Sequence, residues 1–185
     1  MRHLPPHVLH SSFSRRDSRT PTYAIALLGL IALVALIALS GCRPAPRIPD
    51  APTLWVTDAA GMLSPTTAQV LDTQLKQYED RTGHQVIVWT ARKQPKGMSI
   101  ESYCLLLFNT WGIGRHGSDD GVVLFVFAED RKLRIQVGTG LERKLTDRES
   151  ARIINDVIGP RMARGEPDAA MVEGVAAMLA ALGAP

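Results

Sequence analysis

The chain has 185 residues, of which 45% are hydrophobic and 21% are charged, and its formal net charge is +3. This composition is ordinary for one or two globular domains and excludes a fibrous or disordered chain. Residues 1–41 carry four arginines and one acid, so the rest of the chain is formally neutral. A neutral domain without a basic stripe cannot neutralise phosphates, which excludes nucleic acid as a partner.

An export leader is predicted at the N-terminus. Residues 24–39 are apolar and follow a basic stretch at residues 15–19, an order typical of signal peptides. The sixteen apolar residues would span about 24 Å, which is short for a hydrocarbon core of about 30 Å. Length alone leaves a retained transmembrane helix open as the alternative.

Residues 39–42, with the sequence LSGC, resemble the bacterial lipobox. In that motif the cysteine thiol takes a diacylglycerol, and cleavage then makes the cysteine the first residue. The resemblance predicts a lipoprotein signal peptide over residues 1–41 and acyl chains such as palmitate on Cys42, which would hold the protein at the membrane. Arg43 follows where an aspartate would favour the inner membrane, so we expect a periplasm-facing protein at the outer membrane.

Residues 42–53 contain four prolines, which predicts a stiff tether before a domain over residues 54–183. Ser64 and Pro65 are typical of a helix start, and the apolar spacing predicts a helix of about 18 residues that Gly83 ends. Residues 85–91 are rich in β-branched side chains and predict a strand.

Ser99 is a second predicted N-cap, and the apolar stripe from Ile100 to Trp111 has the spacing of a helix on a core. Residues 122–128 are apolar without alternation, which predicts a strand covered on both faces. Residues 133–137 alternate between apolar and polar, so we expect a hairpin whose second strand shows one face to water.

Thr146 begins a capping box and a third helix, which we expect Gly159-Pro160 to end. A fourth helix is predicted from about residue 167 to residue 182. The order of elements predicts a single-domain α/β sandwich with a mixed, mostly parallel sheet plus a hairpin, flanked by helices.

Three aspartates are the candidate metal ligands. Asp119 and Asp120 precede a glycine at the start of the predicted central strand, and Asp58 lies in a second acidic loop. Carboxylates on tight turns suit a hard cation, Ca²⁺ before Mg²⁺, provided that both loops meet. The alternative is that these are solvated loop aspartates.

Other motifs carry less chemistry. Residues 112–117 match the dinucleotide pattern GxGxxG, but a predicted helix precedes them and a strand follows, the reverse of the required order, which excludes a dinucleotide. Cys104 lies on an apolar stripe, so we interpret it as a core thiol. His84 follows a helix-ending glycine and is interpreted as a cap contact.

Four segments together resemble the TPM domain family. They are residues 56–64, residues 111–122, residues 130–135 and residues 138–147. The resemblance implies a compact α/β sandwich that is usually exported and tethered to a membrane. Some members of the family have acid phosphatase activity, some bind Ca²⁺ through acidic loops, and others are accessory factors for membrane proteins; the acidic site carried over is Asp58, Asp119 and Asp120. The sequence departs from the family with Gln136, Thr139 and Arg143, where Glu, Tyr and Gly are common.

Two functional hypotheses follow. The first is a lipid-anchored binding or accessory module of the cell envelope for membrane-protein assembly or maintenance, whose acidic loops hold Ca²⁺ and which meets an envelope protein. The second is a metal-assisted acid phosphatase of the periplasm, in which a cation on the three aspartates polarises a phosphoryl oxygen. We rank the first hypothesis above the second, because a site of carboxylates alone, without a candidate base, is a thin basis for catalysis.

Overall fold

The computed structural model describes Leu27 and residues 46–183. The predicted lipidation site Cys42 and, apart from Leu27, the predicted leader lie outside the described residues. From Pro46 onward, the described residues belong to one compact unit. Within these described ranges, no helix combines the length and the apolar character needed to cross a membrane.

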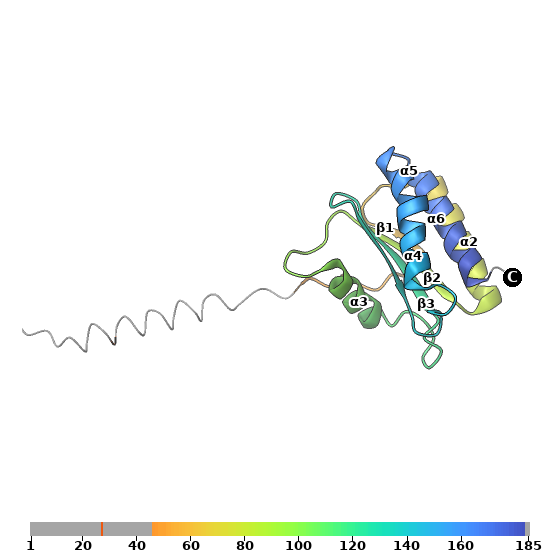
Figure 1. The fold of residues 1–185 in the computed structure, drawn as a ribbon, viewed down its shortest axis with the longest axis horizontal. Helices are drawn as coiled ribbons and strands as arrows, with labels where there is room; N and C mark the ends of the chain where they lie inside the picture. The colour runs from red at the N-terminus through yellow and green to blue at the C-terminus, as the bar shows by residue number, and fades with distance from the viewer. Residues whose placement is uncertain (1–26, 28–45, 184–185) are drawn as a thin grey trace, which may run out of the picture. The chain divides into compact units, whose positions relative to one another are not determined.

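Figure 1 labels most of the helices and strands, and the bounds of all of them follow. They are β1 (Val56–Asp58), α2 (Pro65–Thr82), β2 (Gln85–Ala91), α3 (Ile100–Trp111), β3 (Gly121–Phe127), β4 (Lys132–Val137), α4 (Asp147–Arg152), the π-helix η1 (Ile153–Ile158), α5 (Gly159–Ala163) and α6 (Pro167–Leu182).

The strands form one sheet in the order β1-β2-β3-β4. The first three strands are parallel, and β4 is antiparallel to β3, which confirms the predicted mixed sheet with a hairpin. All seven residues of β3 are buried, as expected for an inner strand covered on both faces. The short strand β1 was not predicted from the sequence, because three residues give too little periodicity to recognise.

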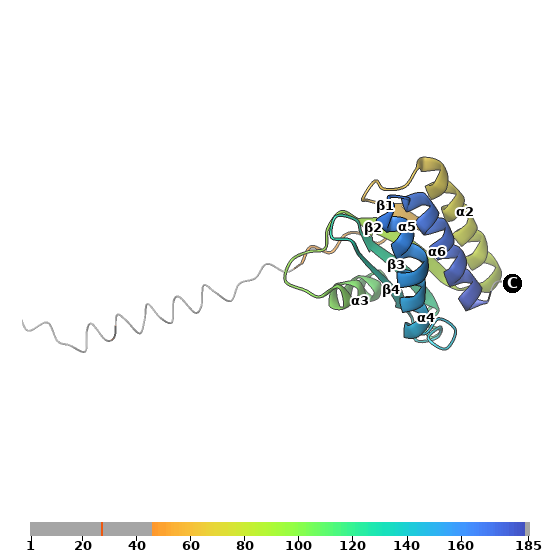
Figure 2. The same ribbon diagram turned by 45° about the horizontal axis from the view of Figure 1, so that its top comes forward.

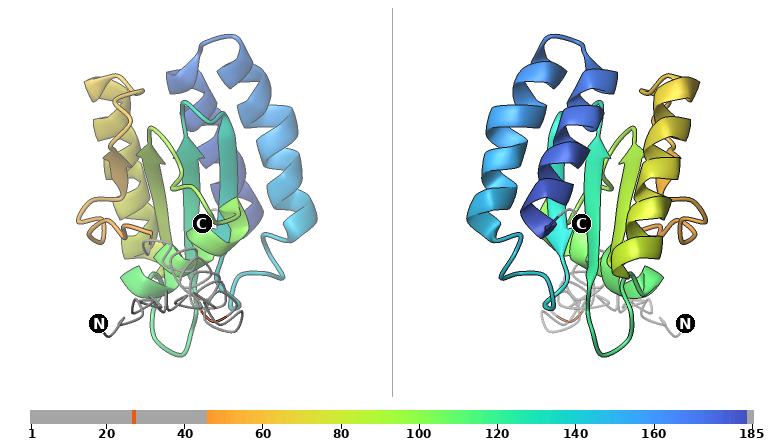
Figure 3. Two further views of the ribbon diagram at one scale, coloured as in Figure 1. Left: turned by 90° about the vertical axis from the view of Figure 1, so that its left-hand side faces the viewer. Right: turned by 90° about the vertical axis from the view of Figure 1, so that its right-hand side faces the viewer.

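Helices cover the sheet on both faces (Figure 1). The helix α3 packs on one face, where Cys104 and Leu107 meet Val123 and Phe125 in a cluster rich in aromatic rings. The helices α2, η1 and α6 pack on the other face around the larger core (Figures 2 and 3). The inner strands β2 and β3 therefore contribute alternate side chains to both cores.

The predicted N-caps are confirmed. The hydroxyls of Ser64, Ser99 and Thr146 accept backbone N–H groups of the first turns of α2, α3 and α4. Gly83 ends α2 in the left-handed conformation, and its N–H donates to the carbonyl of Glu79. These caps fix where the helices begin and end, as their side-chain chemistry predicts.

The prediction that Gly159-Pro160 ends the third helix is wrong. The chain stays helical through η1 and α5 to Ala163. A proline lacks the N–H that an α-helix needs and crowds the preceding turn, but here a π-helical turn comes first, with the N–H of Gly159 bonded to the carbonyl of Ile154. The wider turn allows Pro160 to stand at the start of the next helical segment.

Candidate functional site

Asp58 lies at the C-terminal end of β1 and holds the loop that leads into α2. Its carboxylate accepts the N–H groups of Met62, at 3.2 Å, and of Leu63, at 2.8 Å. It also accepts the hydroxyl of Thr90 on the neighbouring strand β2. These three donors tie the loop to the sheet, so the carboxylate has a structural role.

Asp120 lies immediately before β3 and is only 4% exposed. Its carboxylate accepts the backbone N–H and the Nε of Arg115, each at 2.8 Å, and a terminal guanidinium nitrogen of the same residue. Burial on its own raises the pKa of Asp120, but the hydrogen bonds and the charge of Arg115 outweigh it and hold that pKa below its ordinary value. The aspartate closes the loop between α3 and β3.

Asp119 is exposed, and its carboxylate contacts the segment after β4 instead of Arg115. Its backbone is left-handed, with φ of 47°, and its carboxylate accepts the hydroxyl of Thr139 at 3.1 Å. The segment that follows β4 lies directly against this loop, because a Cβ at Gly138 would overlap the carbonyl of Asp119 and one at Gly140 would overlap that of Ser118. Two glycines therefore allow the backbones to touch and place Thr139 beside Asp119.

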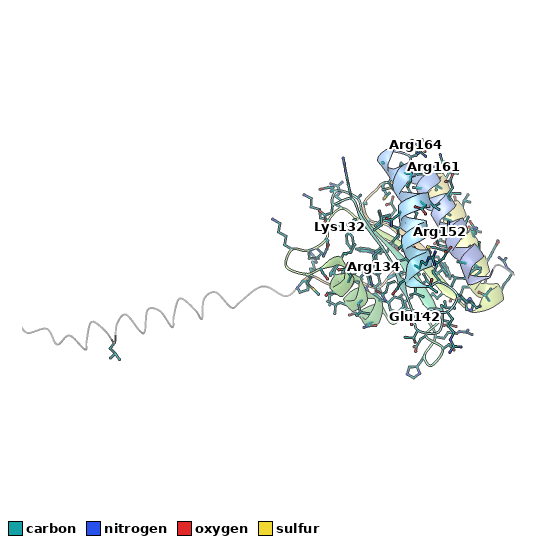
Figure 4. The ribbon with its side chains drawn as sticks, in the orientation of Figure 1. Lys132, Arg134, Glu142, Arg152, Arg161 and Arg164 are labelled. Carbon is teal, nitrogen blue, oxygen red and sulfur yellow. The ribbon has the colours of Figure 1, made fainter. Side chains whose placement is uncertain are left out.

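A groove of about 310 Å³ opens at this point between α3 and the segment after β4. We call it the acidic groove. Its polar lining comes from Asn109, Asp119, Gln136, Thr139 and Glu142, and its apolar wall includes Leu105, Phe108 and Ile113. Glu142 is labelled in Figure 4, on the turn that follows β4. The groove thus offers two carboxylates beside an apolar surface.

The three predicted metal ligands do not come together, which corrects the expectation of one three-aspartate site. Asp58 pairs in register with Thr90, whereas Asp120 precedes Gly121, which pairs with Gln85. Five residues along a strand separate these levels of the sheet by about 17 Å, at roughly 3.3 Å per residue. Asp58 and the Asp119-Asp120 pair lie at opposite ends of the strands.

A divalent cation therefore does not fit the predicted set. Asp58 and Asp120 already have their carboxylates bonded within the protein, Asp120 by a guanidinium. Across residues 46–183, no group of three or more histidine, cysteine, aspartate or glutamate residues is arranged to hold a metal ion. The side-chain oxygens that do share one cavity include those of Asp119, Thr139 and Glu142.

The remaining titratable side chains have packing roles. Cys104 is fully buried, and burial raises the pKa of its thiol to about 12, which confirms that it is a core thiol. The Nδ1 of His84 lies 3.2 Å from the hydroxyl of Tyr78. Burial, and then the nearby Lys144, lower the pKa of His84. Neither side chain lines the acidic groove.

Sequence reasoning missed Glu142 and treated Gln136 and Thr139 only as departures from a family pattern. The signal that could have found them is the pair of glycines around Thr139, since closely spaced glycines after a strand indicate a close backbone approach. Their partner across the contact, Asp119, lies about twenty residues earlier in the sequence. No local pattern identifies such a partner.

The chain resembles known proteins in both sequence and fold. The TPM domain matches residues 56–181. The N-terminal domain of a protein from P. gingivalis, solved by NMR, is 29% identical with a TM-score of 0.65, and the match covers 74% of this chain and 92% of that one. No curated protein sequence matches significantly.

Two further solution structures share the fold at lower identity. The N-terminal domain of the cg2496 protein from Corynebacterium glutamicum is 14% identical with a TM-score of 0.55, and the match covers 77% of this chain and 88% of that one. The BA42 protein from Bizionia argentinensis is 17% identical with a TM-score of 0.55, with 65% and 81% covered. With the matched segment spanning every strand and helix of the sheet domain, the chain belongs to the TPM domain family.

Proposed function

We propose that this TPM-domain protein is a lipid-anchored binding module of the bacterial cell envelope that serves membrane-protein assembly or maintenance. Lipid on Cys42 would hold it at the membrane, the outer membrane in preference to the inner, and the domain would face the periplasm. The observation that carries the proposal is the acidic groove, where two carboxylates lie beside an apolar wall on a surface that the fold leaves open. Such a surface suits an envelope protein partner.

Calcium is the second part of the proposal. The oxygens of Asp119, Glu142 and Thr139 line one cavity, and Ca²⁺ prefers oxygen ligands in flexible numbers. Mg²⁺ suits the groove less well, because it demands a near-ideal octahedron of ligands. A cation there would neutralise the groove and link it to an acidic group of the partner.

The phosphatase hypothesis is weaker after the fold is known. It relied on one cation held by Asp58, Asp119 and Asp120, and the sheet register separates the first from the other two. The thiol of Cys104 is buried, and its high pKa keeps it protonated, so it does not serve as a nucleophile in its place. We therefore retain the binding module alone.

Lipid attachment is tested by growing cells with labelled palmitate. We expect label on the wild-type protein and on the Cys104→Ser variant, whose thiol lies in the core, and none on Cys42→Ser. The Cys42→Ser variant should also differ from the wild type in cell fractionation, because it lacks the lipid that holds the wild-type protein in the membrane fraction. Label that persists on Cys42→Ser would refute the anchor.

Cation binding is tested by thermal unfolding of the mature, detergent-solubilised protein during a Ca²⁺ titration. A ligand that binds only the folded state raises the unfolding midpoint as its concentration exceeds the Kd. We expect the midpoint to rise in the wild type and not in Asp119→Asn. The matched control is Asp80→Asn, which removes the same charge from the exposed face of α2 and should respond as the wild type does.

Partner binding is tested by crosslinking in envelope membranes, with Asp119→Asn/Glu142→Gln against Asp80→Asn. A specific partner should be captured by the wild type and by Asp80→Asn, and lost from the double variant. Equal capture by all three proteins would show that the acidic groove is not the binding surface. An unfolding midpoint that does not change at millimolar Ca²⁺ would refute calcium binding. The acidic groove as a partner-binding surface would then be tested by the crosslinking experiment alone.

A further inference from the structure

One end of the domain carries an excess of basic side chains. The strands β2 and β3 are parallel and end side by side, in register. The loops that follow them are in contact, because the N–H of Glu129 donates to the carbonyl of Arg92 at 2.9 Å. Residues 92–99 and residues 128–132 together contain five basic and two acidic residues, and we call these two segments the basic end.

The two acids of the basic end do not cancel its charge. Glu129 pairs with Lys93 at 3.1 Å, and the carboxylate of Asp130 accepts the N–H of Gln94 at 2.7 Å. The other basic side chains of the two segments are exposed and form no ion pair within residues 46–183; they are Arg92, Lys96, Arg131 and Lys132.

The charges around the basic end are largely compensated. Glu101, in the first turn of α3, attracts Lys132 and Arg134 and offsets one of the two. On the β1 side, Asp58 and Asp168 are half-buried and accept N–H groups of the loop before α2. The arginines and glutamates of α5 and α6 pair with one another; they are Arg161, Arg164, Glu166 and Glu173. The excess therefore stays with the exposed cations of the two loops.

A cavity of about 350 Å³ opens at the basic end, between the turn that joins β3 to β4 and the helix α5. Arg131 and Lys132 line it, and no acidic side chain of the described part of the chain does. Its walls also include Leu133, Met162 and Ala163. A phosphate joined to hydrocarbon fits this lining, because the cations attract the phosphate and the walls accept apolar atoms.

The chain enters the domain at the same end. The hydroxyl of Tyr103 donates to the carbonyl of Arg47 at 3.2 Å, and the Tyr103 ring packs on Phe127, the last residue of β3, with the ring centroids 6.0 Å apart. Figure 1 shows the orange beginning of this segment on the same side of the domain as the loop that precedes α3. Arg47 is exposed and Ile48 is 41% exposed, so the entry offers both charge and hydrocarbon.

The predicted lipid site is close to this entry along the chain. Cys42 precedes Pro46 by four residues, which span at most about 14 Å when fully extended. An anchor on Cys42 would therefore keep the entry, and with it the basic end, close to the bilayer surface. The acidic groove lies toward the other end of β3, which is seven residues and about 20 Å long.

We propose that the basic end docks on anionic phospholipid headgroups of the membrane that holds the lipid on Cys42, with a headgroup phosphate in the cavity beside Arg131 and Lys132. The inference rests on the proposed lipid anchor and gives it an orientation. The basic end faces the bilayer, and the acidic groove faces away from it, toward the envelope partner. Each cation near an anionic surface raises the ratio of docked to undocked protein about fivefold.

Hydrogen exchange tests the docking. The mature, detergent-solubilised protein is inserted from outside into vesicles of phosphatidylcholine, or of phosphatidylcholine mixed with anionic phosphatidylglycerol. Amides of residues 92–99 and 128–132 should exchange more slowly in the anionic vesicles, whereas residues 115–119, before β3, should not change. At about 1 M salt the difference should disappear, because the Debye length falls to about 3 Å.

A triple variant tests the cations. Arg92→Gln/Lys96→Gln/Arg131→Gln removes exposed side chains that make no hydrogen bond among the described residues, so the fold should be kept. The docked ratio should fall about 100-fold, and exchange in anionic vesicles should return to the rate in neutral vesicles.

The matched control is Arg81→Gln/Arg143→Gln/Lys144→Gln. It removes two exposed arginines and one exposed lysine near the other end of the strands, where Lys144 acts on His84 before β2. This variant should keep the slow exchange of the wild type. Ala163→Trp should fill the cavity and restore fast exchange at residues 128–132, while residues 92–99 stay slow.

The proposal is overturned if exchange slows equally in both kinds of vesicle, if the first triple variant keeps the slow exchange, or if the control variant loses it. Equal exchange of Ala163→Trp and wild type would exclude the cavity as the place of the phosphate. Inorganic phosphate, added to neutral vesicles at the concentration of the lipid phosphate, should have no effect. Slowing by this ion would identify a free anion as the ligand and would also overturn the proposal.

Failure of the anchor is recognised separately. A protein without lipid would not sediment with neutral vesicles, which refutes the anchor. The basic end would then still be tested, since the wild type and the control variant should sediment with anionic vesicles and the first triple variant should not. Equal sedimentation of all three proteins would overturn the docking as well.

Discussion

Arg115 holds the carboxylate of Asp120 from both its backbone and its side chain, and so closes the loop that ends at β3. The backbone N–H and the Nε each donate at 2.8 Å, and a terminal nitrogen adds a third bond. The aspartate is nearly buried, whereas the arginine side chain is 61% exposed. The charge pair is therefore partly solvated, and removing one partner costs less free energy than it would in a fully buried pair.

Asp120→Asn should destabilise the domain by about 1–3 kcal/mol, because the amide nitrogen faces guanidinium donors and leaves buried bonds unmade. The neighbouring Asp119→Asn is the matched control. It removes the same charge from an exposed side chain, and asparagine tolerates the left-handed backbone, so we expect a change within about 0.5 kcal/mol. Urea unfolding of both variants measures the difference, and equal losses would contradict the structural role of Asp120.

Acid should destabilise the domain in two steps. The pKa of His84 is lowered from 6.5, by burial and then by Lys144. As pH falls, this histidine is therefore protonated in the unfolded chain at a higher pH than in the folded protein, and stability falls as pH drops through about 6.5. The pKa of Asp120 is lowered from 3.8, because the bonds to Arg115 outweigh burial, so its contribution is present above about pH 4 and is lost below it.

Thermal unfolding between pH 8 and pH 3 measures both steps. His84→Gln should flatten the first step and leave the second. Asp120→Asn should reduce the second step and leave the first, although Glu149, Glu166 and Asp168, whose pKa values are also lowered, retain part of it. A single transition that neither substitution alters would contradict these assignments.

Most of the fold could be predicted from the sequence because its signals are local. The cap at Ser64, the apolar stripe after Ser99 and the uninterrupted apolar strand each act within one element, and the structure confirms all three. The continuation through Pro160 was missed because the π-helical turn before it leaves no simple residue pattern. Local sequence patterns therefore predicted the type of each of these elements correctly but failed to predict where the third helix ends.

The candidate site was less predictable, since it depends on register and strand order. The aspartates at residues 58, 119 and 120 resemble one acidic set in the sequence, yet the parallel register places them at opposite ends of the sheet. The role of Glu142 in the acidic groove can be recognised only once the segment after β4 is known to lie against the loop of Asp119. Such contacts join residues far apart in the chain, which no local pattern reports.

Gly140→Ala should destabilise the domain and open the acidic groove, because the new Cβ would overlap the backbone carbonyl of Ser118. Overpacking of this kind costs about 1–3 kcal/mol, and backbone cannot move aside as a flexible side chain can. Gly61→Ala is the comparison, since it meets no atom within 4 Å and carries only the strain of a positive φ, roughly 1 kcal/mol. Ca²⁺ titration should then show a weaker response in Gly140→Ala than in Gly61→Ala.

Asp58 and Thr90 should show energetic coupling that is independent of calcium. The hydroxyl of Thr90 donates to the Asp58 carboxylate and accepts the N–H of Ala60, so the two side chains fix one loop against β2. In a double-mutant cycle, Asp58→Ala and Thr90→Val should each destabilise by about 1–3 kcal/mol and together by less than their sum, because each removes the hydrogen bond between the two side chains. Since Asp58 lies at the far end of the strands from the acidic groove, Asp58→Asn should keep the Ca²⁺ response of the wild type. If Asp58→Asn folds but its unfolding midpoint no longer rises with Ca²⁺, Asp58 would be a metal ligand, which would contradict its purely structural role.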